Sequence, residues 1–196
     1  MNKENIVTPK GVLVYPHLNK ADTKFDKDGV WRATLRLDKK DAEGLIKKLT
    51  DEIEANIAAE TQKKGKPVKA ANKPFSEDED GNILFNFKLK AGGTRNTGEK
   101  WYQKPILYDS KGNIFDPKDK IIWGGTEAKV AFQASPYNVG SIGCGVSLRL
   151  KAVQILNLIT GGADAASYGF KKEDGFEAQK ENEEVTLAEA TNSSDF

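Results

Sequence analysis

The chain has 196 residues, 38% of them hydrophobic and 30% charged, which suits one domain that buries a core beneath a charged surface. Its formal net charge of +1 hides an asymmetry, because residues 1–160 carry a net charge of +7 and residues 161–196 one of −6. The chain has no long apolar run, no secretory signal and only one cysteine and one histidine, so we expect a cytoplasmic protein with no membrane contact, no metal site and no other cofactor.

Two strands are predicted near the N-terminus. Residues 12–15 form a short apolar strand that Pro16 closes, because proline cannot donate a backbone hydrogen bond to a neighbouring strand. Residues 30–37 alternate strictly between apolar and polar side chains, which is typical of a half-buried strand. This second strand therefore presents Arg32 and Arg36 together on its solvent face.

A helix is predicted over residues 39–62, directly after the second strand. Apolar side chains recur at every fourth position from Leu45 to Ile57, which places them on one helix face. Asp38 is predicted as the N-cap, since a short acidic side chain can accept hydrogen bonds from the first helical turn. Residues 63–73 are rich in lysine and are predicted to form a mobile basic loop.

Three further strands are predicted, over residues 83–90, 126–134 and 146–156, and each again alternates between apolar and polar positions. A glycine-rich loop over residues 92–98 leads into an aromatic segment over residues 101–108. Strands joined by turns, with one helix inserted after the second strand, predict a mainly β chain folded as a small antiparallel barrel or sandwich. The solvent faces of the three strands carry five cations: Lys88, Lys90, Lys129, Arg149 and Lys151.

Aromatic side chains interleave with these cations, and the combination is typical of proteins that bind single-stranded nucleic acid. A positive groove follows the phosphates while flat rings stack on the bases, and we expect Trp101, Tyr102 and Tyr137 to stack. Alternation along a strand turns Trp101 and Tyr102 to opposite sides, so at least one of them is expected in the core. The predicted DNA contacts are Arg32, Arg36, Lys88, Lys90, Arg95, Lys100, Trp101, Tyr102, Lys104, Trp123, Lys129, Tyr137, Arg149 and Lys151.

The C-terminal segment, residues 161–196, is rich in alanine, glycine and acidic residues, which predicts a flexible tail. No basic residue follows Lys180, and the chain ends on an aromatic ring. Such a ring can anchor in a pocket while the carboxylates steer the tail toward a basic surface. The tail residues predicted to bind partners are Glu181, Glu183, Glu184, Glu189, Asp195 and Phe196.

The basic strand faces, the helix over residues 39–62 and the acidic tail that ends on Asp195 and Phe196 together resemble the single-stranded-DNA-binding proteins of bacteriophage replication systems. The resemblance implies that residues 1–160 form an OB-like five-stranded antiparallel barrel that coats unpaired DNA in replication, recombination and repair, without enzymatic activity. It also implies that the tail docks on the phage DNA polymerase and helicase, competes with DNA for the groove and supports a homodimer. The last eleven residues hold only two acidic side chains, fewer than is usual for the family.

Other functions stay open on the sequence alone. Asp116 or Asp119, together with Glu127 and Lys129, matches the acidic-acidic-x-Lys pattern of Mg²⁺-dependent nucleases. That signal is weak, because Glu-x-Lys occurs by chance in a chain this charged. A phage structural or adaptor protein would use the basic face to meet another protein, and a DNA-annealing protein would share the chemistry of a DNA-coating one.

Overall fold

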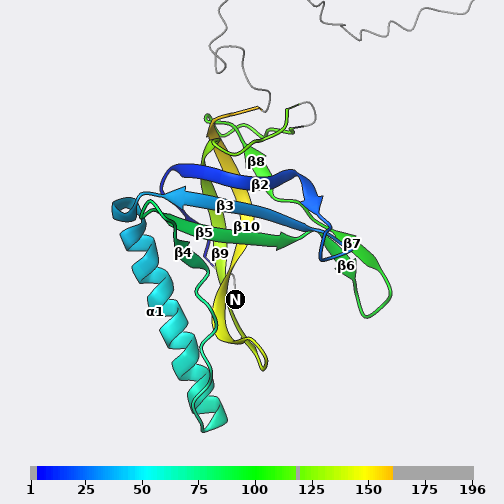
Figure 1. The fold of residues 1–196 in the computed structure, drawn as a ribbon. Helices are drawn as coiled ribbons and strands as arrows, with labels where there is room; N and C mark the ends of the chain where they lie inside the picture. Colours follow the sequence, from blue (N-terminus) through cyan, green and yellow to red (C-terminus); the bar gives the residue numbers. More distant parts are fainter. Residues whose placement is uncertain (1–3, 118–119, 161–196) are drawn as a thin grey trace, which may run out of the picture. The chain divides into compact units, whose positions relative to one another are not determined.

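Five strands close into a ring in the computed structural model, which describes residues 4–117 and 120–160 (Figure 1). Four of the five pairings around the ring are antiparallel, whereas β5 and β10 run parallel, so the antiparallel prediction fails at this one contact. The mainly β, OB-like barrel is otherwise confirmed. In order around the ring the strands are β2 (Gly11–Asp22), β3 (Val30–Leu37), β5 (Ile83–Lys90), β10 (Gly143–Asn157) and β9 (Glu127–Val139).

Three short strands pair with individual strands of the ring. β1 (Ile6–Val7) pairs with β9, β4 (Phe75–Glu77) pairs with β5, and β8 (Ile106–Tyr108) pairs with β10. The predicted glycine-rich loop belongs to a separate hairpin made of β6 (Gly92–Thr94) and β7 (Lys100–Tyr102). Figure 1 shows this hairpin projecting from the barrel beyond the end of β5 and the start of β3.

The single helix of the described residues, α1 (Lys39–Lys64), follows β3 as predicted and packs its apolar face against β9 and β10. It extends two residues further than predicted and ends at Gly65, whose φ of 64° suits glycine. Asp38 occupies the N-cap position, but its side chain makes no capping hydrogen bond. Within the described ranges, neither α1 nor any other segment offers a helix apolar enough to cross a membrane.

The apolar faces of the ring strands meet inside the barrel, as the alternation predicted. Phe85, Phe87 and Phe132 are fully buried, and the ring centroids of Phe87 and Phe132 lie 5.0 Å apart. Burial of one such ring stabilises the folded protein by roughly 1.5–3 kcal/mol. This stabilisation keeps the same face of each strand toward the core. Because the apolar positions are fixed inward, the alternate positions Lys88 and Arg149 are exposed on the outer face.

The first predicted strand is longer than expected, because Pro16 does not end it. β2 pairs with β3 at Val14 and again at His17, and the register shifts by one residue between these two pairs. Tyr15 adopts a φ of 46° at this bulge. A bulge leaves a residue without a ladder hydrogen bond, so it accommodates the proline that lacks a backbone N–H.

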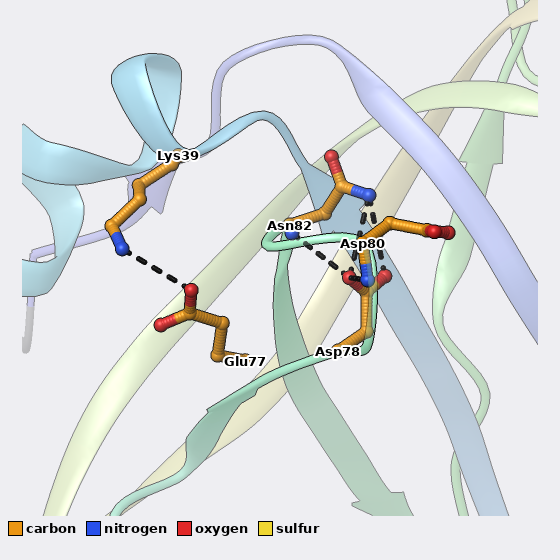
Figure 2. Close-up of polar contacts among 5 residues, drawn as sticks. All are labelled: Lys39, Glu77, Asp78, Asp80 and Asn82. Atoms are coloured by element: carbon orange, nitrogen blue, oxygen red, sulfur yellow. Dashed lines mark hydrogen bonds and ion pairs between the residues drawn. The ribbon is translucent and has the colours of Figure 1, made fainter.

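An aspartate side chain closes the turn between β4 and β5. Figure 2 shows the Asp78 carboxylate accepting hydrogen bonds from the backbone N–H groups of Asp80 and Asn82, at 3.0 and 2.8 Å. Lys39, at the start of α1, forms an ion pair with Glu77 of β4 at 3.1 Å in the same view. The turn and the ion pair connect the start of β5, which carries Lys88 and Lys90, with the start of the helix.

The turn that follows β8 repeats this arrangement. Asp109 accepts hydrogen bonds from the backbone N–H groups of Lys111 and Asn113, at 2.9 and 2.8 Å, and from the Asn113 side chain at 2.9 Å. The hydrogen bonds from Asn113 are the main reason that the pKa of Asp109 lies below its ordinary value.

Candidate nucleic-acid interface

A groove of about 770 Å³ opens on the solvent face of β5 and β10. The start of β3, the segment before β4, and strands β7 and β9 complete its walls. Five of the fourteen predicted DNA contacts line it: Lys88, Lys90, Trp101, Tyr137 and Arg149. Aromatic and cationic side chains that are far apart in the sequence therefore share one open depression.

Three cations lie side by side across neighbouring strands at one level of the barrel. Arg32 of β3 is opposite Lys88 of β5, and Lys88 is in register with Arg149 of β10. Like charges in such positions repel one another and destabilise the sheet. An arrangement that carries this cost is suited to a ligand that supplies negative charge at regular intervals, as phosphates do.

Nearby carboxylates neutralise some of these cations but not all of them. Asp22 pairs with Arg32 at 3.4 Å, and a hydrogen bond from a backbone N–H, followed by the Arg32 charge, holds the pKa of Asp22 below its ordinary value. Lys90 lies 3.8 Å from Asp26. Within the described part of the chain, no carboxylate forms an ion pair with Lys88 or Arg149. Lys88 and Arg149, on the two strands at the centre of the groove, thus contribute unpaired positive charge to it.

Each of the two rings in the groove is opposite a glycine on the neighbouring strand. Trp101 pairs with Gly93, and a Cβ at Gly93 would lie 3.0 Å from the indole. Tyr137 pairs with Gly145, where a Cβ would lie 2.9 Å from the tyrosine hydroxyl. The absence of side chains at these two positions lets both rings lie against the backbone of the adjacent strand.

Replacing Gly145 with alanine should therefore displace Tyr137 and weaken oligonucleotide binding several-fold, with a loss of stability of roughly 1–3 kcal/mol from overpacking. The added methyl group would also lie 3.0 Å from the Ala71 Cβ, so it has no free space on that side either. Fluorescence-anisotropy titration and thermal unfolding measure the two effects. Gly140→Ala is the matched control, because no atom lies within 4 Å of its Cβ position; equal effects of both substitutions would contradict the role of Gly145.

Two amide side chains connect the elements that form the groove. Asn56 of α1 donates hydrogen bonds to the carbonyl oxygens of Tyr137 and Gly145, at 3.2 and 2.8 Å, and so ties the helix to this ring–glycine pair. Gln103 donates to the carbonyl of Lys90 at 2.7 Å and accepts a hydrogen bond from Arg149 at 3.4 Å. Gln103 thereby connects the segment after β7 with both central strands.

The sequence analysis missed most of the neutral residues in the groove. Asn86 and Ser147 belong to the same outward faces as Lys88 and Arg149, so the alternation that identified the cations could have identified them as well. The other lining residues that were not predicted as contacts are Asp26, Val30, Asn72, Lys73, Pro74, Leu89, Gln103, Ser135, Val146 and Leu148.

Two predicted aromatic contacts lie outside the groove lining. Tyr102 has 77% of its surface exposed and follows Trp101 in β7, so alternation places it on the opposite side of that strand. Trp123 is half exposed in the loop before β9, and its backbone N–H donates to the carbonyl of Ile159. Neither ring lines the groove with Trp101 and Tyr137. The expectation that Trp101 or Tyr102 lies in the core is wrong, because Trp101 is only partly buried and Tyr102 is exposed.

The other predicted cations are distributed around the barrel. Arg32 lies next to the groove through its pairing with Lys88, as described above. Lys151 occupies the register shift of β10, and Lys104 pairs with Asp116 at 3.8 Å. The β6–β7 hairpin carries exposed Arg95 and Lys100, whereas Arg36 and Lys129 each line separate depressions. The predicted tail contacts, from Glu181 to Phe196, lie outside the described residues.

The residues of the alternative nuclease site do not converge. Asp116, Glu127 and Lys129 line three different depressions, and Glu127 pairs with Lys10 at 3.1 Å. Asp119 lies outside the described residues. Over residues 4–117 and 120–160, no group of three or more histidine, cysteine, aspartate or glutamate side chains is arranged to hold a metal ion.

Known proteins share this fold and sequence pattern. One is gp2.5, a single-stranded DNA binding protein encoded by bacteriophage T7, whose sequence is 25% identical to this chain. Its crystal structure superposes with a TM-score of 0.72, and the match covers 90% of this chain and 100% of gp2.5. The single-stranded DNA-binding protein from bacteriophage Enc34 in complex with ssDNA shares the fold at 15% identity, with 78% and 86% coverage and a TM-score of 0.58. No curated protein sequence matches the chain. The family model for the single-stranded DNA-binding protein of bacteriophage T7 matches residues 7–158, and the chain therefore belongs to this family of phage single-stranded DNA-binding proteins.

Proposed function

We propose that this protein coats unpaired DNA during phage replication and recombination by holding it in the groove over β5 and β10. The observation that carries the proposal is the row of Arg32, Lys88 and Arg149, which lies beside two rings on an open face. The Enc34 neighbour, which was solved with single-stranded DNA, lends support because it has the same fold. No step of this function requires a cofactor.

The proposed contacts divide into two kinds. Lys88, Lys90 and Arg149, with Arg32 beside them, neutralise phosphates and release counterions, which makes affinity fall steeply with salt. Trp101 and Tyr137 stack on bases, and each stacked base contributes about 1–3 kcal/mol. Stacking is indifferent to base identity, so the groove suits a protein that covers DNA of any sequence.

Titration with a single-stranded oligonucleotide at two salt concentrations tests this function. Because Trp101 lines the groove, binding should quench its intrinsic fluorescence, and the logarithm of the affinity should fall linearly with the logarithm of salt concentration. A matching duplex, whose bases are not free to stack, should bind more weakly. Salt-independent binding, or cleavage of the oligonucleotide in Mg²⁺, would contradict the proposal.

Residues 161–196 are proposed to act as an acidic C-terminal tail attached to the DNA-binding domain of residues 1–160. Its carboxylates compete with DNA for the groove, and its terminal Phe196 docks on the phage DNA polymerase and helicase. The uneven distribution of charge supports this proposal, because residues 161–196, with a net charge of −6, are attracted to residues 1–160, with a net charge of +7. In the host cell this activity belongs to the cytoplasm, and the tail also supports a homodimer.

Deleting residues 181–196 should tighten oligonucleotide binding roughly fivefold or more at low salt, because a competing polyanion is removed. The gain should shrink at high salt, where the attraction between tail and groove is screened. Anisotropy titrations of the full chain and the truncated chain at two salt concentrations measure this. Unchanged affinity at low salt would rule out competition by the tail, and a variant with glutamine at positions 181, 183 and 184 separates charge from length.

A further inference from the structure

The last turn of α1 and the segment that leads from it to β4 carry an unusual concentration of positive charge. Residues 63–73 contain five lysines and no acidic or aromatic residue. All five lysines, here called the lysine track, are exposed: Lys63, Lys64, Lys66, Lys69 and Lys73. In the described part of the chain only Lys63 of this set has a carboxylate partner, Glu60, at 3.9 Å.

Residues 69–71 of this segment are hydrogen-bonded to β10, which the prediction of a mobile basic loop did not include. The Cys144 N–H donates to the carbonyl of Lys69 at 2.7 Å, and the Ala71 N–H donates to the carbonyl of Cys144 at 2.8 Å. Gly143 permits this close approach, since a Cβ there would lie 2.7 Å from the Lys69 carbonyl oxygen. Residues 69–71 thus lie along the start of β10 as a parallel bridge.

The lysine track leads directly into the groove. Lys73 and its neighbours Asn72 and Pro74 line the groove, and Ala71 lies against the Gly145 position opposite Tyr137. Figure 1 shows α1 and the β9–β10 hairpin projecting from the same side of the barrel, with the segment returning beside the helix toward β4. The hairpin tip, residues 138–145, has no charged residue that would neutralise the lysines.

We propose that the lysine track is a second DNA-binding element, which extends the path of single-stranded DNA from the groove toward the C-terminal end of α1. The inference rests on the proposed function of the groove and adds a site that only longer strands reach. Residues 66–73 span at most roughly 25 Å when extended, enough for several additional nucleotides. A protein partner fits less well, because protein interfaces depend on aromatic anchors and this segment has none.

A comparison of two strand lengths tests the lysine track separately from the groove. The full chain and the variant K64Q/K66Q/K69Q are titrated with oligo-dT of about 6 and about 20 nucleotides. The shorter length lies within the roughly 4–16 nucleotides that an OB fold covers, and the longer exceeds them. Glutamine keeps the backbone hydrogen bonds of residues 69–71, and thermal unfolding confirms that the variant is folded. The control is K40Q/K47Q/K111Q, which removes the same charge from exposed positions outside the groove.

The track variant should bind the short strand within about twofold of the unmodified chain and the long strand at least tenfold more weakly at about 50 mM salt. Its salt slope on the long strand should be smaller by about 2, since each lost phosphate contact removes about 0.7 on single strands. Unchanged long-strand affinity, or an equal loss in the control, would overturn the lysine track while leaving the groove intact. Failure of the unmodified chain to bind either strand would instead overturn the proposed function itself.

Discussion

Replacing Lys88 and Arg149 together with glutamine should lower the affinity for a short single-stranded oligonucleotide roughly 50-fold at about 50 mM salt. Both side chains are exposed at the centre of the groove, lie in register on neighbouring strands and have no carboxylate partner among the described residues. Loss of two phosphate contacts should also reduce the salt slope by about 1.4. Anisotropy titrations over a range of salt concentrations measure both quantities.

The same substitution should not destabilise the fold. Arg32, Lys88 and Arg149 repel one another across the sheet, so removal of two of these charges should leave the melting temperature unchanged or raise it. The matched control is K40Q/K47Q, which removes the same charge from exposed positions on α1. If the control lowers affinity equally, or if K88Q/R149Q keeps the full salt slope, DNA does not use these cations.

Replacing Trp101 with alanine should weaken binding by about 1–3 kcal/mol, which corresponds to roughly 5- to 150-fold. The ring lines the groove and lies against Gly93, so its position is set before DNA arrives. Trp101→Phe should retain part of the affinity, since a smaller ring can still stack. Titrations that follow a labelled oligonucleotide avoid the loss of tryptophan fluorescence in these variants.

Tyr102→Ala is the natural control for this prediction, because Tyr102 is the next residue of β7 and points away from the groove. It should change affinity less than about twofold, within the usual range of surface substitutions. If Tyr102→Ala is the more damaging change, DNA runs along the opposite side of the β6–β7 hairpin. If Trp101→Ala lowers only the melting temperature, this ring serves packing alone.

Strand alternation predicted which side of each strand faces solvent, and that part of the account follows from local sequence. Lys88 and Arg149 are outward because Phe87 and Leu148, their immediate neighbours, are buried. Alternation also placed Trp101 and Tyr102 on opposite sides of a strand, but it carries no information about which side faces the groove. The glycines of β6 do not make that choice either, because Gly93 is opposite Trp101 and Gly92 is opposite Tyr102.

The assembly of the groove depends on contacts between distant segments, which no local pattern reveals. β5 and β10 are adjacent only through their parallel pairing, where Leu148 lies beside Phe87 and Arg149 beside Lys88. From the sequence alone, Arg149 and Lys129 are equivalent cations on the solvent faces of their strands. In the structure Arg149 lines the groove, whereas Lys129 lines a different depression. Trp123 illustrates the same limit, because its position in the sequence gave no indication that it lies outside the groove lining.

The most direct test of the groove as the DNA site is photocrosslinking with a single-stranded oligonucleotide that contains 5-iododeoxyuridine, followed by peptide mapping of the adducts. The account predicts adducts at Trp101 and Tyr137, the two rings that line the groove. Adducts confined to the exposed rings Tyr15, Tyr102 and Trp123, with none at Trp101 or Tyr137, would contradict it.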